Sequence, residues 1–250
     1  MSSTGRGRTR VKNDFYSTPE SVADQFYDMC FPHYEFIADD HGHFVIDPCA
    51  GSGSLLRPAK RRGYEVKAIE VRKEEEDALN LLCGGHSNVT IGSAFDPMNR
   101  KLGSFLDNFC VGNPPYGENL DLYLERWAYG WRYSAQLMRL NFAGGVGRVV
   151  NFTSKGKRPS DIWVLSQRPV FVWTCRTKGC TSAPVPPGTT EKCPECGDRY
   201  TPGNDSGEFA WFVWQRGWTE DHTRFHWLPP HTGRAVEKFK EARAQGDLFA

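Results

Sequence analysis

The chain has 250 residues, 39% of them hydrophobic and 13% aromatic, with a formal net charge of +1 at pH 7. This length and composition are sufficient for one α/β core with additions, and the near-zero charge excludes a global basic field as the means of holding a nucleic acid. No apolar run approaches the ~20 residues that span a bilayer and no apolar amino-terminal segment indicates secretion, so we expect a cytoplasmic protein.

Basic residues gather in three places, which are the candidates for contact with phosphates. We expect residues 1–13 to form a flexible basic tail. The cations of the three clusters are Arg6, Arg8, Arg10 and Lys12; Arg57, Lys60, Arg61 and Arg62; and Lys155, Lys157 and Arg158. Each cluster is either a solvated surface or a phosphate-contacting arm, because phosphate contacts fix the register of a nucleic acid without reading its sequence.

A strand followed by a glycine turn is predicted near residue 45. Residues 43–46 form a short apolar run, Asp47 and Pro48 end it, and Gly51 and Gly53 follow. Such a turn lets the backbone approach a ligand at the carboxyl end of a parallel strand, although glycines alone are weak evidence.

Three further strands are predicted over residues 65–69, 89–92 and 109–112. The first of them ends at Glu70, where an acid can accept both ribose hydroxyls, as in dinucleotide-binding folds. The last of them leads to Asn113. A glycine turn, an acid and an asparagine at successive strand ends together predict a site for an adenosine-containing cofactor.

The most informative segment is Asn113-Pro114-Pro115-Tyr116. The exocyclic amine of a nucleobase is a poor nucleophile because its lone pair is delocalised into the ring. The side-chain oxygen of Asn113 and the carbonyl of Pro114 can both accept hydrogen bonds from that amine, and proline holds its carbonyl in an extended conformation. Tyr116 can stack on a base that has been turned out of the duplex. The segment therefore predicts methyl transfer to an amine, with positioning supplying most of the rate.

The second half of the chain is read mainly from the period of its apolar residues. We predict helices over 118–141, 161–166 and 234–244, and strands over 148–152, 169–173 and 208–214. The last two strands are expected to be antiparallel neighbours at one edge of the sheet.

Four of the eight cysteines have the spacing of a zinc ribbon, Cys175-x4-Cys180-x12-Cys193-x2-Cys196. The Cys-Pro-x-Cys-Gly turn of the second pair is the stronger half of this pattern, and four thiolates leave no open coordination position. We therefore expect Zn²⁺ in a structural role. The ribbon is inserted between the two predicted edge strands, where it either contacts DNA or braces the sheet or an oligomer.

The final segment, Gln245-Gly246-Asp247-Leu248-Phe249, resembles the Gln-x-x-Leu-Phe peptide by which bacterial replication proteins dock on the sliding clamp. Two apolar side chains on a free tail have no evident core to join, which suits a docking peptide, although a pentapeptide of this kind also arises often by chance. The alternative is a simple frayed terminus.

Taken together, these motifs resemble those of the S-adenosylmethionine-dependent DNA amino-methyltransferases, especially the adenine-N6 enzymes of phages and restriction-modification systems. The resemblance covers roughly residues 14–173 and 208–216 and includes Phe15-Tyr16-Ser17-Thr18-Pro19, which is similar to a segment that closes over the methionine end of the cofactor. It implies that Asp47 and Gly51 lie near the methionine moiety and that Glu70 binds the ribose.

The resemblance also implies a full set of site residues. The catalytic residues are Asn113, Pro114, Pro115 and Tyr116, and the cofactor-binding residues are Tyr16, Thr18, Pro19, Asp47, Pro48, Ala50, Gly51, Gly53, Glu70, Ser93, Ala94 and Asp96. The family commonly has Gly-Asp at the end of its third strand, near the adenine of the cofactor. This chain has Gly92-Ser93-Ala94-Phe95-Asp96 instead, so either Ser93 or Asp96 takes that place.

The sequence thus predicts an α/β fold with a doubly wound, seven-stranded, mostly parallel, Rossmann-like sheet. The methyltransferase domain is assigned to residues 14–173 and 208–232, the zinc-ribbon insertion to 174–207, and a helix and tail to 233–250. The predicted activity is methyl transfer from S-adenosylmethionine to the N6 amine of a flipped-out adenine in DNA. Cytosine N4, adenine in RNA and a protein glutamine amide are alternative acceptors, and an inactive zinc-ribbon protein that binds nucleic acid is a further alternative.

Overall fold

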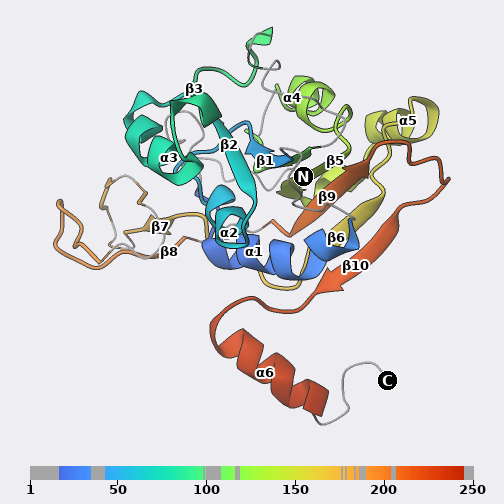
Figure 1. Cartoon of the computed structure of the whole chain (residues 1–250). Helices are drawn as coiled ribbons and strands as arrows, with labels where there is room; N and C mark the ends of the chain where they lie inside the picture. The colour runs from blue at the N-terminus through green and yellow to red at the C-terminus, as the bar shows by residue number, and fades with distance from the viewer. Residues whose placement is uncertain are drawn as a thin grey trace.

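The computed structural model describes residues 17–34, 43–97, 99, 108–115, 119–175, 177, 179–182, 184–185, 190–203 and 207–244. Its centre is an eight-stranded sheet in the order β10-β6-β9-β5-β4-β1-β2-β3 (Figure 1). The strands are β1 (Phe44–Asp47), β2 (Glu65–Glu70), β3 (Val89–Ile91), β4 (Phe109–Gly112), β5 (Tyr133–Arg139), β6 (Asp161–Leu165), β9 (Phe209–Gln215) and β10 (Arg224–Leu228). All neighbours pair in parallel except β9, which is antiparallel to both β5 and β6.

Helices cover both faces of this sheet. They are α1 (Glu20–Gln25), α2 (Leu56–Arg61), α3 (Glu76–Cys83), α4 (Leu120–Trp127) and α5 (Val146–Ser154), and a further helix, α6 (Gly233–Ala244), follows β10. Helix α1 continues into a π-helical turn over Phe26–Cys30 and a 3-10 turn over Phe31–His33, and further 3-10 turns are Lys73–Glu75, His86–Asn88 and Leu140–Ala143. In the described part of the chain, no helix has the length and apolar character needed to cross a bilayer.

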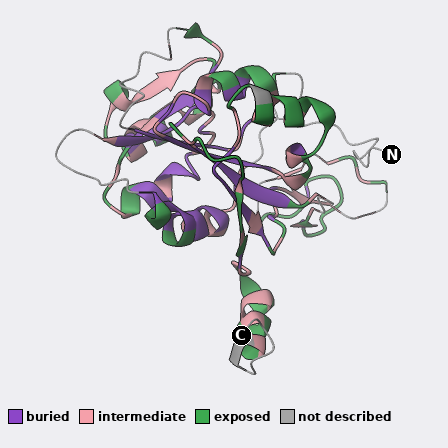
Figure 2. Cartoon of the chain, turned by 90° about the vertical axis from the view of Figure 1, so that its right-hand side faces the viewer, coloured by how far each residue is buried: buried purple, intermediate pink, exposed green. Residues whose placement is uncertain are grey.

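Alternate residues of the central strands face two separate cores. Val45 and Phe109 pack with the helices α1 to α3, whereas Ile46 and Cys110 pack with α4 on the other face. Every residue of β1 and β4 is buried, as expected of parallel strands that are covered on both sides. Figure 2 shows these buried strands at the centre and the exposed surfaces on the outer helices.

The order of the strands fixes where a ligand can bind. From β1 the chain adds β2 and β3 on one side, and then β4 and β5 on the other side of β1. The gap between the loops that follow β1 and β4 is the topological switch point of the sheet, where open α/β folds bind ligands at the carboxyl ends of their strands.

The helix predicted over 118–141 is wrong in its second half. Helix α4 ends at Trp127, and residues 133–139 form strand β5, of which only Arg139 is not fully buried. Ala135 and Met138 of this strand continue the helical period of α4 in the sequence, so the period alone extended the predicted helix into a buried strand.

Two neighbouring predictions are exchanged. Residues 148–152 lie within helix α5 instead of a strand, and residues 161–165 form strand β6 instead of a helix. Val146, Val149 and Val150 are exposed on α5, whereas most of β6 is buried. Short apolar runs do not distinguish these two cases, and β5 already fills the place in the sheet that the predicted strand would take.

The predicted pairing of 169–173 with 208–214 is also wrong. Strand β9 has β5 on one edge and β6 on the other, so neither edge is left for residues 169–173. Instead, β7 (Trp173–Thr174) pairs with β8 (Thr201–Pro202) in a small separate sheet. The main sheet has eight strands instead of seven because β10 pairs with the outer edge of β6.

The insertion of residues 166–208 leaves the main sheet and returns to it at the edge that carries the carboxyl ends of the parallel strands. It leaves after Leu165 and returns at Phe209, which is opposite Arg139 at the end of β5. Helix α6 follows β10 at the same edge, because Leu228 pairs with Leu165. Figure 1 shows the small sheet and α6 projecting from the body of the protein.

Candidate active site

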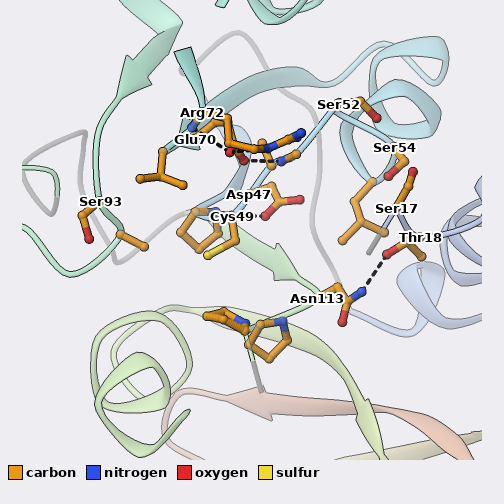
Figure 3. Close-up of a pocket in the computed structure, with 18 of the residues that line it drawn as sticks. Ser17, Thr18, Asp47, Cys49, Ser52, Ser54, Glu70, Arg72, Ser93 and Asn113 are labelled. Carbon is orange, nitrogen blue, oxygen red and sulfur yellow. Dashed lines mark hydrogen bonds and ion pairs between the residues drawn. The ribbon is translucent and has the colours of Figure 1, made fainter. Parts of the chain in front are cut away.

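A cavity of about 390 Å³ lies at the switch point between β1 and β4 (Figure 3). It collects residues from five separate segments of the chain. The lining residues are Ser17, Thr18, Asp47, Pro48, Cys49, Ala50, Gly51, Ser52, Ser54, Leu55, Glu70, Val71, Arg72, Gly92, Ser93, Ala94, Phe95, Asn113, Pro114, Pro115 and Asn119.

The glycine turn after β1 forms one wall of this cavity. The N–H of Cys49 donates to Asp47 Oδ1 at 2.9 Å, which holds the carboxylate at the start of the turn. Gly53 has φ +81°, a conformation that favours glycine, and a Cβ there would lie 2.5 Å from Leu82 Cδ2 of α3 and would have to displace that side chain. Gly53 thus packs against α3 and is not among the lining residues.

Glu70 and Arg72 form a polar group at the end of β2. Glu70 Oε2 accepts the N–H of Gly51 at 2.7 Å, and Oε1 accepts both the N–H of Arg72 at 2.9 Å and its Nε at 3.1 Å. Arg72 also pairs with Glu75. The acid therefore ties the glycine turn to β2. Each carboxylate oxygen can accept more than one hydrogen bond, so this arrangement is compatible with ribose hydroxyls at the same group.

Asp47 is almost completely buried at the floor of the turn. Burial raises the pKa of its carboxyl group from the ordinary value of 3.8 to about 7, the N–H of Cys49 opposes the rise, and the nearby charge of Glu70 adds to it. A cationic ligand in the cavity would favour the ionised form, because an opposite charge stabilises a carboxylate.

The loop after β3 is fixed from behind by α4. Trp127 Nε1 donates to the carbonyl of Ala94 at 3.0 Å, and Arg126 donates to the carbonyl of Phe95. Ser93, Ala94 and Phe95 line the cavity, whereas Asp96 does not. The sequence allowed either Ser93 or Asp96 at the position near the adenine of the cofactor. In the structure, Ser93 lies against the cavity and Asp96 does not.

Asn113 follows β4 and lies on the opposite wall from the loop after β3. Its side-chain Nδ2 donates to the hydroxyl of Thr18 at 3.2 Å, across 95 positions of sequence. Pro114 and Pro115 line the same cavity. The predicted residues Tyr16 and Tyr116 lie outside the described residues, and Pro19 begins helix α1 next to the cavity without lining it.

A fully buried polar network supports Asn113 from below. Tyr123 Oη donates to Gln136 Oε1 at 3.1 Å, Gln136 Nε2 donates to Ser134 Oγ at 2.9 Å, and Ser134 donates to the carbonyl of Trp127 at 2.8 Å. A Cβ on Gly112 would lie 2.4 Å from Tyr123 Oη and 2.5 Å from Gln136 Oε1. Glycine before Asn113 is therefore required because the network occupies the space of a side chain.

Several lining residues were not predicted from the sequence. Ser17, Cys49, Ser52, Ser54 and Phe95 adjoin predicted residues, and an extension of each motif by one position would have found them. Arg72 gave no comparable signal, because a charged residue after a strand is usual at protein surfaces.

The four clustered cysteines come together at the insertion. Their sulfur atoms lie within 4.8 Å of one another, with 3.3 Å between Cys175 and Cys196 and 3.5 Å between Cys180 and Cys193. Four sulfurs at about 2.3 Å from one ion form a tetrahedron with edges of about 3.8 Å, so these separations suit a tetrathiolate site. The N–H of Gly197, at φ +74°, closes the turn onto the carbonyl of Cys193 at 2.8 Å.

The interpretation of Arg57, Arg61 and Arg62 as a phosphate-contacting patch is not supported. These three side chains pair with Glu20, Asp24 and Asp28 of the first helical segment, at 2.6 to 3.2 Å. The cluster fastens α1 to α2 instead of presenting free positive charge. Lys157 is similarly paired with Glu125, and Arg158 donates to the carbonyl of Glu220. The basic tail and the clamp-like segment Gln245–Phe249 lie outside the described residues.

Comparisons with solved structures give the fold a class. A protein described as a class I S-adenosylmethionine-dependent methyltransferase from Listeria monocytogenes is similar over 90% of this chain and 70% of its own, with a TM-score of 0.52 and 12% identity. The type IIG restriction endonuclease BpuSI matches 97% of this chain, with a TM-score of 0.54 and 13% identity. A nuclease-deletion mutant of the Type ISP restriction-modification enzyme LlaGI, solved with a DNA substrate mimic, matches 93% at a TM-score of 0.54 and 11% identity.

These likenesses establish the fold of class I methyltransferases. The chain spans only 30% and 29% of the two restriction enzymes, so it corresponds to one part of each. No protein-family model and no curated protein matches the sequence.

Proposed function

We propose that the protein is an S-adenosylmethionine-dependent methyltransferase that modifies the exocyclic N6 amine of adenine in DNA. The observation that carries the proposal is the meeting of Asn113 with the glycine turn and Glu70 in one cavity at the switch point. The fold and the restriction-modification proteins among its structural neighbours support the class of reaction and of substrate.

The residues of the cavity fit the cofactor. Asp47 and Gly51 of the glycine turn would hold the methionine part of the cofactor, and Glu70 would hold the ribose. Ser93 to Phe95 would lie beside the adenine, and all of these residues line the cavity. The cofactor supplies a methyl group on a positively charged sulfur, which needs little further activation. The protein's own task is therefore to hold and orient the acceptor amine.

Asn113 and Pro114 perform that task in the proposed mechanism. The Asn113 side-chain oxygen and the Pro114 carbonyl each accept a hydrogen bond from the target amine, which draws its nitrogen toward tetrahedral geometry and directs the lone pair at the methyl carbon. The N–C bond forms as the S–C bond breaks, and the amine then releases one proton to solvent. Tyr116 is the proposed stacking partner for the extruded base.

The tetrathiolate cluster is proposed to hold a structural Zn²⁺. Four thiolates complete a tetrahedral shell and leave no place for a substrate, so the ion orders the insertion and takes no part in the chemistry. The position of the insertion, at the same sheet edge as Asn113, supports a role beside the substrate.

The proposed activity is tested by incubating the full chain with labelled S-adenosylmethionine and duplex DNA, followed by nucleoside mass analysis. We expect N6-methyladenine, and Asn113→Ala should lower turnover by about 10²-fold or more while cofactor affinity measured by calorimetry stays nearly unchanged. If the labelled methyl group is found on cytosine N4, only on RNA or on a glutamine, the assignment of adenine in DNA as the substrate is wrong. Absence of cofactor binding in the wild-type chain would overturn the enzymatic assignment altogether.

A further inference from the structure

We infer that Thr18 is a positioning residue for Asn113, and that its hydroxyl, by accepting from Nδ2, holds the Asn113 amide with its oxygen directed at the acceptor amine. This inference rests on the proposed function, because it concerns the orientation of the same catalytic side chain. The resemblance to DNA amino-methyltransferases assigns Thr18 only to cofactor binding.

An asparagine amide can sit in two orientations that differ by a half-turn and have nearly the same shape. In one orientation Oδ1 accepts from the substrate amine, and in the other Nδ2 presents its own protons to that amine. The second orientation sets donor against donor, so neither group gains a hydrogen bond. Catalysis by Asn113 therefore requires a partner that accepts from Nδ2 on the far side and holds the amide in the first orientation.

Thr18 is that partner. Its Oγ1 accepts from Asn113 Nδ2 at 3.2 Å, and both residues line the cavity. Figure 3 shows the amide nitrogen of Asn113 directed at Thr18, with the amide oxygen turned away from it. Thr18 is only 4% exposed, so few water molecules can replace its hydroxyl as the acceptor.

Thr18 is itself held in place by the helix that follows it. Pro19 is the N-cap residue of α1, and its carbonyl accepts the N–H of Val22 at 3.0 Å. Glu20 pairs with Arg57 at 2.6 Å, and Arg57 also donates to the carbonyl of Ser52 in the glycine turn. The acceptor for Asn113 is thus anchored to the same turn that forms the proposed cofactor wall.

The experiment compares Thr18→Val, which removes the hydroxyl and keeps the shape, with Thr18→Ser, which keeps the hydroxyl. With duplex DNA, we expect kcat of the valine variant to fall about tenfold, the value of one hydrogen bond of ordinary strength, while the cofactor Kd changes by less than about twofold. The serine variant should stay within about twofold of the wild type in both quantities.

A matched control is Thr223→Val, which removes another partly buried hydroxyl that makes one hydrogen bond, to the carbonyl of Pro159, away from the cavity. Its kcat should equal that of the wild type. In an Asn113→Ala background, Thr18→Val should have no further effect on kcat, because the residue through which Thr18 acts is gone.

Unchanged kcat in Thr18→Val, equal losses of kcat and cofactor affinity, or failure of serine to rescue would each overturn the inference. A second measurement separates it from the proposed function. The side-chain amide resonances of Asn113 in nitrogen-15 NMR spectra should shift in Thr18→Val and not in Thr223→Val, whatever the substrate. An inactive wild type with this shift would contradict the proposed function alone, and an active wild type without it would contradict the inference alone.

Discussion

Two regions of this molecule hold polar groups in a defined geometry by different physical means. The cavity at the switch point is built on strands that are buried on both faces, and the Tyr123–Gln136–Ser134 network below Asn113 is completely enclosed. In the insertion, by contrast, Cys193 and Tyr200 are the only buried residues in the described part of 174–203. Packing fixes the first region, whereas the second has little apolar surface, and we propose that its four sulfurs order it by binding a metal ion.

The largest effect is expected from removing the metal. Structural zinc contributes about 10 to 16 kcal/mol to the folding of small thiolate peptides, far more than the few apolar contacts of the insertion. A chelator or Cys193→Ser should therefore abolish hydrogen-exchange protection over 174–203 while cofactor affinity, measured by calorimetry, changes little.

The purified protein should contain one zinc per chain by elemental analysis. Cys83→Ala, which removes a buried cysteine of α3 outside the cluster, is the control and should leave the zinc content unchanged. Loss of cofactor binding together with the metal would contradict the separation of the two regions, and a metal-free wild type would remove the zinc assignment.

The next effect concerns the packed region. Gly112→Ala would press a methyl group on Tyr123 Oη and Gln136 Oε1, at 2.4 and 2.5 Å. We expect a loss of about 1 to 3 kcal/mol in the free energy of unfolding and a fall in turnover of about a hundredfold, because Asn113 is displaced with the strand end.

Gly147→Ala on α5 is the matched control, since its Cβ would meet nothing within 4 Å. It should stabilise the protein by roughly 0.5 to 1 kcal/mol in thermal or denaturant unfolding, as alanine does within helices. Wild-type turnover in Gly112→Ala would show that the buried network does not position the site.

The strand ends with the most distinctive chemistry could be predicted from the sequence. Asp47, Glu70 and Asn113 follow short apolar runs directly, so their side chains could be assigned to one sheet edge before the structure. Strand β5 and helix α5 could not, because Ala135 and Met138 of β5 continue the helical period of α4, and three exposed valines give α5 the composition of a strand.

The contacts that complete the site were equally hidden. Thr18 and Asn113 are 95 positions apart, and no local pattern indicates which hydroxyl an amide will meet. The hydrogen bond from the Arg72 guanidinium to Glu70 was equally unpredictable, because it depends on the direction in which a long side chain points. Motifs therefore predicted which segments meet, and packing determined which atoms do.

The smallest expected effect is a dependence of stability and cofactor affinity on pH, which arises from the buried Asp47 in the packed region. Burial raises the pKa of Asp47 to about 7, so the free protein holds an extra proton there between the ordinary value of 3.8 and about 7. Folding stability contributed by this group therefore falls as pH rises through that window and is constant above it. A cationic ligand needs the ionised form, so affinity should rise with pH by at most about tenfold per unit below 7 and level off above it.

Calorimetric titration of the cofactor between pH 5.5 and 8.5 checks this expectation, and buffers of different ionisation enthalpy should report release of a proton on binding below pH 7. Asp47→Asn should bind more weakly and lose most of the pH dependence. The same slope in the asparagine variant would assign the titration to a group other than Asp47.

The way in which the insertion joins the sheet has a consequence for how this protein can diversify. Its two ends lie on the neighbouring antiparallel strands β6 and β9, where Val164 pairs with Ala210. A tight hairpin or a module of any size can close that gap without altering the register of a single strand. One accessory unit can therefore replace another between β6 and β9, while the strands that carry the cavity residues keep their positions.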